Sequence, residues 1–211
     1  MGRIFDLDSP VMQWLTKASH VFFCGIFFLV CCLPVITIGA SCTAMYKMMF
    51  NLREDKGTGA IDFFKVFVRE LRTSTVLWIL DLLAMGIVLG SFYLILRSGK
   101  EGIVLYILML YLFLVFFVWA FSFSYVFAYT AYFRNTVPQT VKNSFFMAVT
   151  HRKETIPVLF LSVLPLLGYM ISPYYFVILL PGWVFLALPA IFYGRSGFLL
   201  RVFASYRDEE E

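Results

Sequence analysis

The sequence predicts an all-α, polytopic helical membrane protein with about five transmembrane helices and two cytoplasmic amphipathic helices. Hydrophobic residues make up 61% of the 211 residues, and charged residues only 14%. Soluble domains usually carry about 25% charged residues. A soluble fold of this length could not bury so much apolar surface, so lipid must solvate much of it. The net charge of +4 therefore indicates orientation in the membrane and contact with anionic lipid, and not nucleic-acid binding.

Apolar runs long enough to cross a hydrocarbon core of about 30 Å divide the chain into its expected elements. We expect one membrane domain over residues 1–211. It comprises an interfacial segment at 1–18, spans near 19–39, 74–96, 103–132, 155–172 and 174–193, and a cytoplasmic tail at 195–211. Pro34 and Gly39 fall late in the first run and predict a kink or an early exit there. Ser172-Pro173 separates the last two spans, because proline ends or bends a helix.

A short basic amphipathic helix is predicted over residues 59–72, between the first two apolar runs. Phe64, Phe67 and Leu71 recur at the spacing of one helical face, whereas Arg69 lies largely off that face. Such a helix suits the membrane interface, with aromatic side chains in the acyl boundary and basic side chains among the headgroups. The alternative is a docking surface for a partner, presented as a helix that fits a groove.

The second half of the chain repeats this pattern. Phe145-Phe146 follow Phe63-Phe64 by 82 residues, and the segment 134–154 around them is also basic. Each copy would comprise an inward span, a cytoplasmic amphipathic helix and an outward span, which predicts a tandem parallel repeat. Chance similarity between phenylalanine-rich segments is the alternative.

Orientation follows from the distribution of basic residues, which accumulate on the cytoplasmic side of a membrane protein. With five spans, 13 of the 17 Lys and Arg residues fall on one side. This distribution predicts an external N-terminus, a cytoplasmic C-terminus, and both amphipathic segments at the cytoplasmic face. His20 and His151 would then lie on opposite sides of the membrane and could not share a metal ion.

Asp81 is the intramembrane polar candidate, since it is the one carboxylate deep inside an apolar run. An ionised carboxylate in hydrocarbon costs several kcal/mol, so Asp81 must pair, face the bundle or take up a proton. It would serve as a proton or cation site, or contact a partner helix. Alternatively, it lies close enough to the cytoplasmic interface to reach water or Arg72. The sequence contains no catalytic or metal-binding motif, so we expect no enzyme, cofactor or metal.

Residues 32–46 read Cys-Leu-Pro-Val-Ile-Thr-Ile-Gly-Ala-Ser-Cys-Thr-Ala-Met-Tyr and resemble the signature of the YesL family. The Phe63-Phe64-Lys65 helix and the entry into the second span also match that pattern, so the resemblance is specific over about residues 5–80. It implies a polytopic helical protein of Gram-positive-type bacteria, commonly encoded beside carbohydrate ABC importers, solute-binding proteins and glycan-degrading enzymes. It implies no established activity, cofactor or catalytic residue.

The small residues of this signature let helix backbones approach closely in lipid. They either pack within this protein's own bundle or contact a permease. We therefore expect an accessory integral protein of the bacterial cell membrane, which binds or assists the permease or ATPase subunits of a carbohydrate ABC importer without catalysis. The alternative is a stand-alone or oligomeric small-solute transporter or channel that uses Asp81. The partner-contact candidates are Pro34, Gly39, Ser41, Thr43, Phe63, Phe64, Arg69, Phe145 and Phe146.

Overall fold

The computed structural model describes residues 10–97, 102–171, 174, 177 and 180–207 of the chain. All regular elements of this part are helices, which confirms the predicted all-α class. In chain order they are α1 (Pro10–Cys32), the short η1 (Val35–Thr37), α2 (Ile38–Arg53), α3 (Ala60–Arg97), α4 (Ile103–Tyr132), α5 (Val137–Thr150), α6 (Arg152–Ile171), the short α8 (Leu180–Gly182), the π-helical η2 (Trp183–Ala187) and α9 (Leu188–Arg207).

Four helical stretches of the described residues are long and apolar enough to cross a membrane, compared with about five expected spans. They are Leu15–Cys32, Ala60–Arg97, Ile103–Tyr132 and Trp183–Tyr206. The third coincides with the span expected near 103–132. α6 carries Pro157 and Pro165 and is not among the four. The expected tail from residue 195 onward is helical through Arg207, because the last apolar stretch continues along α9.

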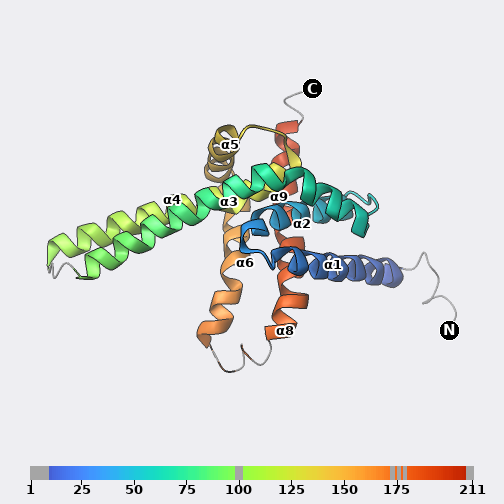
Figure 1. Ribbon diagram of the computed structural model, residues 1–211, viewed down its shortest axis with the longest axis horizontal. Helices are drawn as coiled ribbons and strands as arrows, with labels where there is room; N and C mark the ends of the chain where they lie inside the picture. Colours follow the sequence, from blue (N-terminus) through green and yellow to red (C-terminus); the bar gives the residue numbers. More distant parts are fainter. Residues whose placement is uncertain (1–9, 98–101, 172–173, 175–176, 178–179, 208–211) are drawn as a thin grey trace.

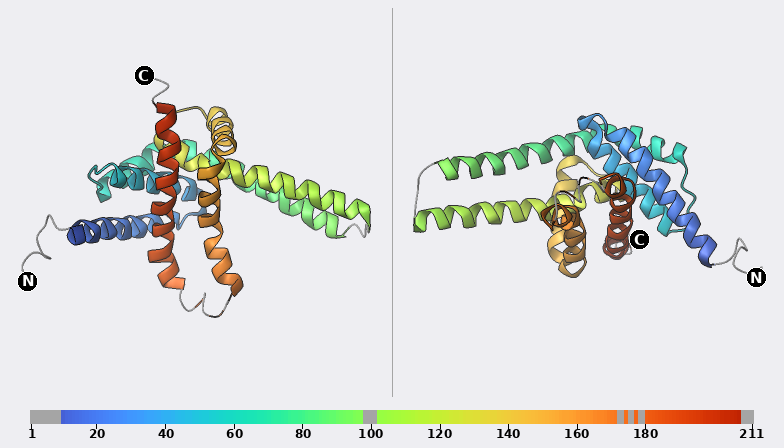
Figure 2. Two further views of the ribbon diagram at one scale, coloured as in Figure 1. Left: turned by 180° about the vertical axis from the view of Figure 1, so that it is seen from behind. Right: turned by 90° about the horizontal axis from the view of Figure 1, so that it is seen from below.

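Two helical pairs project from a common body in different directions (Figure 1). α3 and α4 run antiparallel and form one long hairpin, whereas α6 and α9 form a second pair that lies across the direction of the first (Figure 2). α1 and α2 lie at the end of the α3–α4 hairpin that is remote from its tip. The body is therefore the region where α2 meets α3, α4 and α9, and it contains the largest buried cluster.

α1 and α2 form a tight helical hairpin of their own. At its turn, Thr37 Oγ1 donates a hydrogen bond to the carbonyl oxygen of Cys31 at 2.6 Å, and Trp78 Nε1 of α3 donates to the Val35 carbonyl at 2.9 Å. At its open end, Lys17 Nζ lies 2.8 Å from Asp55 Oδ1. α2 therefore returns antiparallel to α1, and the start of α1 lies beside the loop after α2. The five-span topology predicted from the sequence places these two regions on opposite sides of the membrane.

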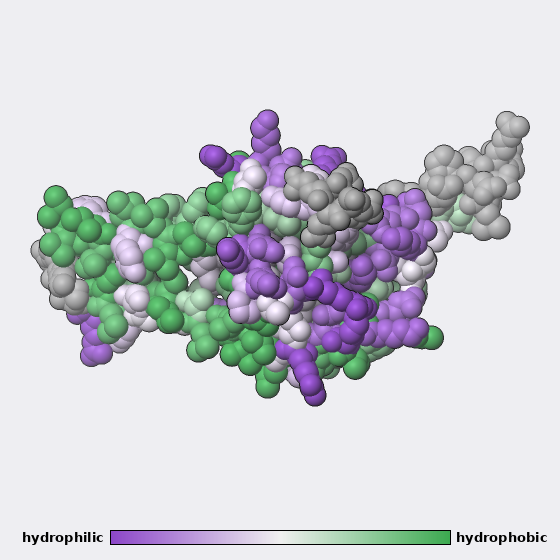
Figure 3. Space-filling view, turned by 90° about the horizontal axis from the view of Figure 1, so that it is seen from above, coloured by the Kyte–Doolittle hydropathy of each residue, from purple (hydrophilic) through white to green (hydrophobic). Residues whose placement is uncertain are grey.

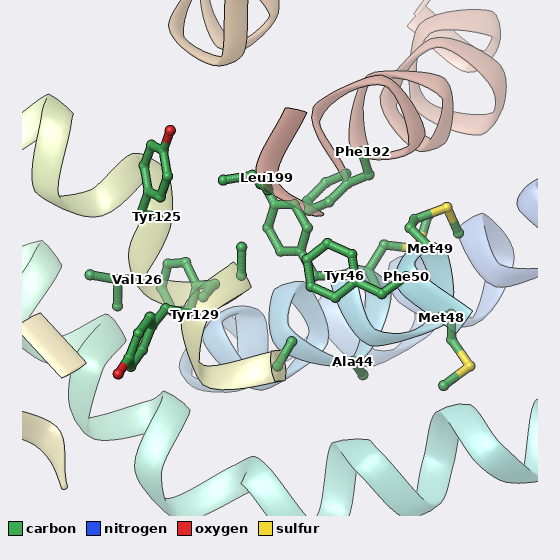
Figure 4. Close-up of a cluster of buried hydrophobic side chains, with 14 of the residues drawn as sticks. Ala44, Tyr46, Met48, Met49, Phe50, Tyr125, Val126, Tyr129, Phe192 and Leu199 are labelled. Carbon is green, nitrogen blue, oxygen red and sulfur yellow. The ribbon is translucent and has the colours of Figure 1, made fainter. Parts of the chain in front are cut away.

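α2 is the most enclosed long helix of the body. Its Tyr46 ring lies 4.8 Å from the Phe192 ring of α9, and its Phe50 ring lies 5.9 Å from the ring of Phe203. Figure 4 shows these α2 side chains gathered with side chains of α4 and α9. Since helices in lipid associate mainly through van der Waals packing, this interdigitation is what holds the hairpin pairs together.

Small residues bring α2 against α3. A Cβ atom on Gly39 would overlap the Ser74 carbonyl oxygen and lie 2.8 Å from Trp78 Cβ, so only glycine permits this approach. Beside it, the hydroxyls of Thr43 and Ser74 form a buried hydrogen bond of 2.8 Å. The small residues of the sequence signature therefore pack inside this chain, which was one of the two alternatives left open by the sequence.

The two copies of the amphipathic pattern have different structures. In the first copy, the helix that begins at Ala60 continues without a break through the following span to Arg97. In the second, α5 ends at Thr150, and α6 begins anew at Arg152 after a break at His151. The repeat in sequence therefore does not produce two equivalent helices.

Candidate functional site

The strongest candidate site is a cavity of about 500 Å³ between α4 and the α6–α9 pair, with α2 and α3 at its edge. Aromatic side chains of α4 form much of its wall, among them Phe113, Phe117 and Trp119. Two charged groups also line it, Asp81 of α3 and Arg195 of α9. Ligand pockets are commonly of this kind: about 300–1,000 Å³, mostly apolar, with a few polar groups.

Asp81 is 9% exposed and accepts a hydrogen bond from Trp119 Nε1 to its Oδ1 atom at 2.8 Å. α3 and α4 run side by side here, which places the indole of one helix against the carboxylate of the other. Among the described residues, no ion pair includes Asp81. The indole of Trp119, and not Arg72, is therefore the side-chain partner of Asp81 in this part of the chain.

Arg195 reaches across the body from α9. Its Nη2 donates to the Ser124 carbonyl oxygen of α4 at 2.9 Å, and its Cζ lies 5.6 Å from the centre of the Tyr46 ring. Within the described part of the chain, neither Arg195 Nε nor the Tyr46 hydroxyl has a hydrogen-bond partner, although both atoms are buried. One wall of the cavity thus offers two unused donors, because Tyr46 itself lines the cavity.

These groups can bind a ligand by ion pairing, hydrogen bonding and aromatic packing. In the described ranges, no three His, Cys, Asp or Glu side chains come together as a metal site would require. His20 Nδ1 lies 3.1 Å from Thr58 Oγ1, and His151 packs against the Tyr206 ring at 5.5 Å. Neither histidine lines the cavity, so it contains no imidazole for acid–base chemistry.

Four of the partner-contact candidates are buried inside the chain. Gly39, Ser41, Thr43 and Phe63 have no appreciable exposed surface. Ser41 donates to the Thr37 carbonyl at 3.0 Å, and Phe63 packs against Phe27. In this structure the contacts of these four side chains therefore lie within the chain's own body.

The other partner-contact candidates remain accessible but lie in separate places. Phe64 is 41% exposed near the start of α3, and Phe146 is 62% exposed on α5, with Phe145 beside it at 38%. Arg69 pairs with the neighbouring Glu70 at 2.7 Å. Pro34 is exposed at the α1–α2 turn. The structure therefore leaves the accessible candidates on three separate elements.

Sequence reasoning missed Arg195, Tyr46 and Trp119 as members of one site. The tail predicted at 195–211 includes Arg195, because the charge count treats each basic residue as solvated. The available signal was the continuation of helical apolar spacing beyond it, at Leu199 and Val202, which are both buried. The contact between Trp119 and Asp81 joins residues of two helices and could not be read from spacing along one helix.

Comparison with known families gives a match over residues 21–92 to the family described as "Protein of unknown function, DUF624". YesL-like proteins belong to that family. The matched segment covers about a third of the chain and includes α2 and Asp81, whereas Trp119 and Arg195 lie outside it. It thus agrees with the resemblance carried by residues 32–46. No curated protein and no solved structure matched the chain.

Proposed function

We propose that the protein is a non-catalytic accessory subunit of the bacterial cell membrane and that its partner is a carbohydrate ABC importer. The observation that carries this proposal is the α3–α4 hairpin. Only 6% of the most apolar stretch of each of its helices is buried, and the hairpin extends well beyond the body (Figure 1). The resemblance to YesL-like proteins favours the importer as the partner, because those proteins are commonly encoded beside such systems.

The surface of the hairpin suits contact with transmembrane helices. On the face seen in Figure 3, most of its far half is hydrophobic. Large side chains are exposed along both helices, including Leu83, Ile87, Leu94, Ile107, Leu110 and Phe113. A helix of 38 residues extends about 57 Å at 1.5 Å per residue, more than a hydrocarbon core of about 30 Å requires. The hairpin is thus long enough to cross the bilayer beside the helices of a permease.

We further propose that both termini are cytoplasmic and that the α1–α2 hairpin enters the membrane and returns. α2 has 16 residues, about 24 Å of helix, which is too short to cross about 30 Å of hydrocarbon. The ion pair between Lys17 and Asp55 supports placement of the N-terminal end of α1 beside the cytoplasmic loop. The apolar turn of the hairpin, with Leu33 81% exposed, would then point into lipid.

The distribution of basic residues supports this orientation. Only Arg97 and Lys100 remain on the outer side, and Arg195 lies within an apolar stretch, which leaves 14 of the 17 Lys and Arg residues on the cytoplasmic side. This asymmetry is stronger than the one given by five spans with an external N-terminus, and positive charge favours the cytoplasmic side. In Figure 3, hydrophilic residues gather over the body, whereas the far half of the hairpin is mostly hydrophobic apart from a hydrophilic group at its tip.

Co-purification with site-specific crosslinking tests the accessory role. A photo-reactive amino acid at Leu110, which is 60% exposed on the hairpin, is expected to capture a permease subunit in cells. The same probe at Phe146 on α5 is the matched control and is expected to capture none. Capture only at Phe146 would place the contact on the amphipathic helix. Recovery of no permease or ATPase subunit from mild detergent would contradict the accessory role.

Cysteine labelling tests the orientation. In a variant without the native cysteines, Thr16→Cys and Gly57→Cys are expected to resist a membrane-impermeant maleimide on intact cells, whereas Ile103→Cys at the tip of the α3–α4 hairpin is expected to react. All three positions are exposed in the structure, so permeabilised cells provide the control for reactivity. Labelling of Thr16→Cys from outside would restore the five-span orientation and exclude a re-entrant α1–α2 hairpin.

The cavity beside Asp81 favours a second candidate function, solute binding or transport. A carboxylate inside a membrane protein marks substrate and ion pathways in many transporters. Flux in liposomes that is abolished by Asp81→Asn would support this function. Absent flux, or flux that the substitution leaves unchanged, would count against it.

A further inference from the structure

We propose that the cavity between α4 and the α6–α9 pair binds an anionic phospholipid. Its phosphate would contact Arg195 and Tyr46, and an acyl chain would lie along the aromatic wall of α4. The proposal does not depend on the identity of the partner, because it concerns only groups that line this cavity.

Arg195 brings to the cavity a positive charge that has no ion-pair partner among the described residues. Arg195 lies within the apolar stretch Trp183–Tyr206, where an arginine is costly and normally marks a functional contact. The guanidinium is held by the Ser124 carbonyl and still has an unused buried Nε donor. A phosphate supplies both the missing negative charge and the acceptor oxygens that a guanidinium fits.

The depth of Arg195 favours a lipid phosphate. Its partner Ser124 precedes the end of α4 at Tyr132 by eight residues, or about 12 Å of helix. With this end of α4 at the cytoplasmic face, the long arginine side chain can reach toward the inner headgroup region. Tyr46 adds a second donor, because it is only 2% exposed and its hydroxyl has no partner in the described part of the chain.

The walls favour an occupant with an apolar chain. Phe113 and Phe117 line the cavity and are 62% and 46% exposed on α4. The cavity is therefore continuous with the hairpin surface that faces hydrocarbon. Asp81, the other charged group of the lining, is already bonded to Trp119 on the α3–α4 side. The α2–α9 side thus remains the one at which an anion would be stabilised.

Native mass spectrometry of the full-length protein in a neutral detergent tests the proposal. The probes are phosphatidylglycerol, phosphatidylcholine and inorganic phosphate. We expect phosphatidylglycerol to bind at least about tenfold more tightly than phosphatidylcholine, since only the former brings net negative charge to the guanidinium. We expect inorganic phosphate not to compete, because it has no chain to fill the aromatic wall.

Substitutions locate the binding. Arg195→Gln is expected to remove the preference for phosphatidylglycerol, whereas Arg195→Lys keeps most of it. Arg201→Gln is the matched control, because Arg201 is exposed on the same helix and does not line the cavity. Tyr46→Phe is expected to weaken binding a few fold without a loss of volume, and it serves as the test if Arg195→Gln does not fold.

Four results would overturn the proposal. The first is equal binding of the two lipids by the wild-type protein. The second is an unchanged preference in Arg195→Gln or unchanged affinity in Tyr46→Phe. The third is an equal loss in Arg201→Gln, which would indicate diffuse surface charge. The fourth is full competition by inorganic phosphate, which would indicate an anion site that does not require lipid.

Discussion

α2 and the far half of the α3–α4 hairpin are both helical, yet their surroundings are opposite. Most of the 16 residues of α2 are buried, whereas only 6% of the most apolar stretch of α3 or of α4 is buried. The more polar helix is thus the one inside the protein, because lipid solvates the apolar hairpin and small residues allow α2 to pack closely. In this protein, high hydropathy therefore marks the helices that face lipid, and small side chains mark the helix that packs against other helices.

The largest expected effect concerns α2, the closely packed helix of this comparison. Gly39→Ala places a methyl group against the Ser74 carbonyl and Trp78 Cβ. Overpacking of this kind typically costs about 1–3 kcal/mol and occasionally more, and here the obstructing atoms are backbone and Cβ atoms that cannot rotate away. We expect a large fall in apparent Tm, measured by size-exclusion chromatography of heated protein in detergent.

Gly90→Ala is the matched control on the hairpin. Apart from neighbouring residues and the backbone of its own helix, no atom lies within 4 Å of a Cβ at that position, and alanine favours helix over glycine by about 0.5–1 kcal/mol. The apparent Tm is expected to hold or rise slightly. A fall in Tm as large as that of Gly39→Ala would erase the difference between the two regions.

The next effect concerns the base of the hairpin, where Trp119 donates to Asp81. Trp119→Phe leaves a buried carboxylate without this donor, which is expected to cost about 1–3 kcal/mol. Asp81→Leu removes the group that needs the donor, so the double variant is expected to lose less than the sum of the single variants. The apparent Tm of all four proteins in one double-mutant cycle measures this coupling. Additive losses would show that the indole and the carboxylate act independently.

A smaller effect is expected at the polar contact between α2 and α3. Thr43→Val and Ser74→Ala each remove one hydroxyl of a buried 2.8 Å hydrogen bond, and each is expected to cost about 1 kcal/mol. The Thr43 hydroxyl also donates to the Gly39 carbonyl at 3.1 Å. Thr43→Val therefore removes two hydrogen bonds and leaves the Ser74 hydroxyl without its Thr43 partner. A double-mutant cycle on apparent Tm is expected to show coupling, and independent losses would contradict the contact.

The sequence was sufficient for the features that depend on composition and local periodicity. The all-α class, the limits of α4 and the position of Asp81 in an apolar run all follow from the spacing of apolar residues along one helix. The expected span near 103–132 matches α4 at Ile103–Tyr132, because a continuous apolar run bounded by polar turns has only one interpretation in lipid.

Contacts between distant helices could not be predicted in the same way. Arg53 at the end of α2 bonds the Ser196 hydroxyl of α9 at 2.8 Å, and Gly197 leaves room for its guanidinium. Arg53 and Ser196 are 143 positions apart in the sequence, and no pattern in either segment indicates that the two residues make contact. The return of α2 beside α1 was missed for a related reason, since Pro34 indicates a bend but not the direction of the chain after it.

The smallest expected effect on stability falls on the far half of the hairpin. Leu110→Ala removes a side chain that is 60% exposed, so the transfer and cavity costs of a buried leucine do not apply, and the change is expected to stay within about 0.5 kcal/mol. If the hairpin binds a permease, the same substitution is expected to reduce co-purification of that subunit while apparent Tm holds. Leu77→Ala on the buried part of α3 is the opposing control, because it leaves a cavity and is expected to lower the apparent Tm. Equal Tm losses for the two leucines would mean that the hairpin packs against the body in solution, and the contrast with α2 would then fail.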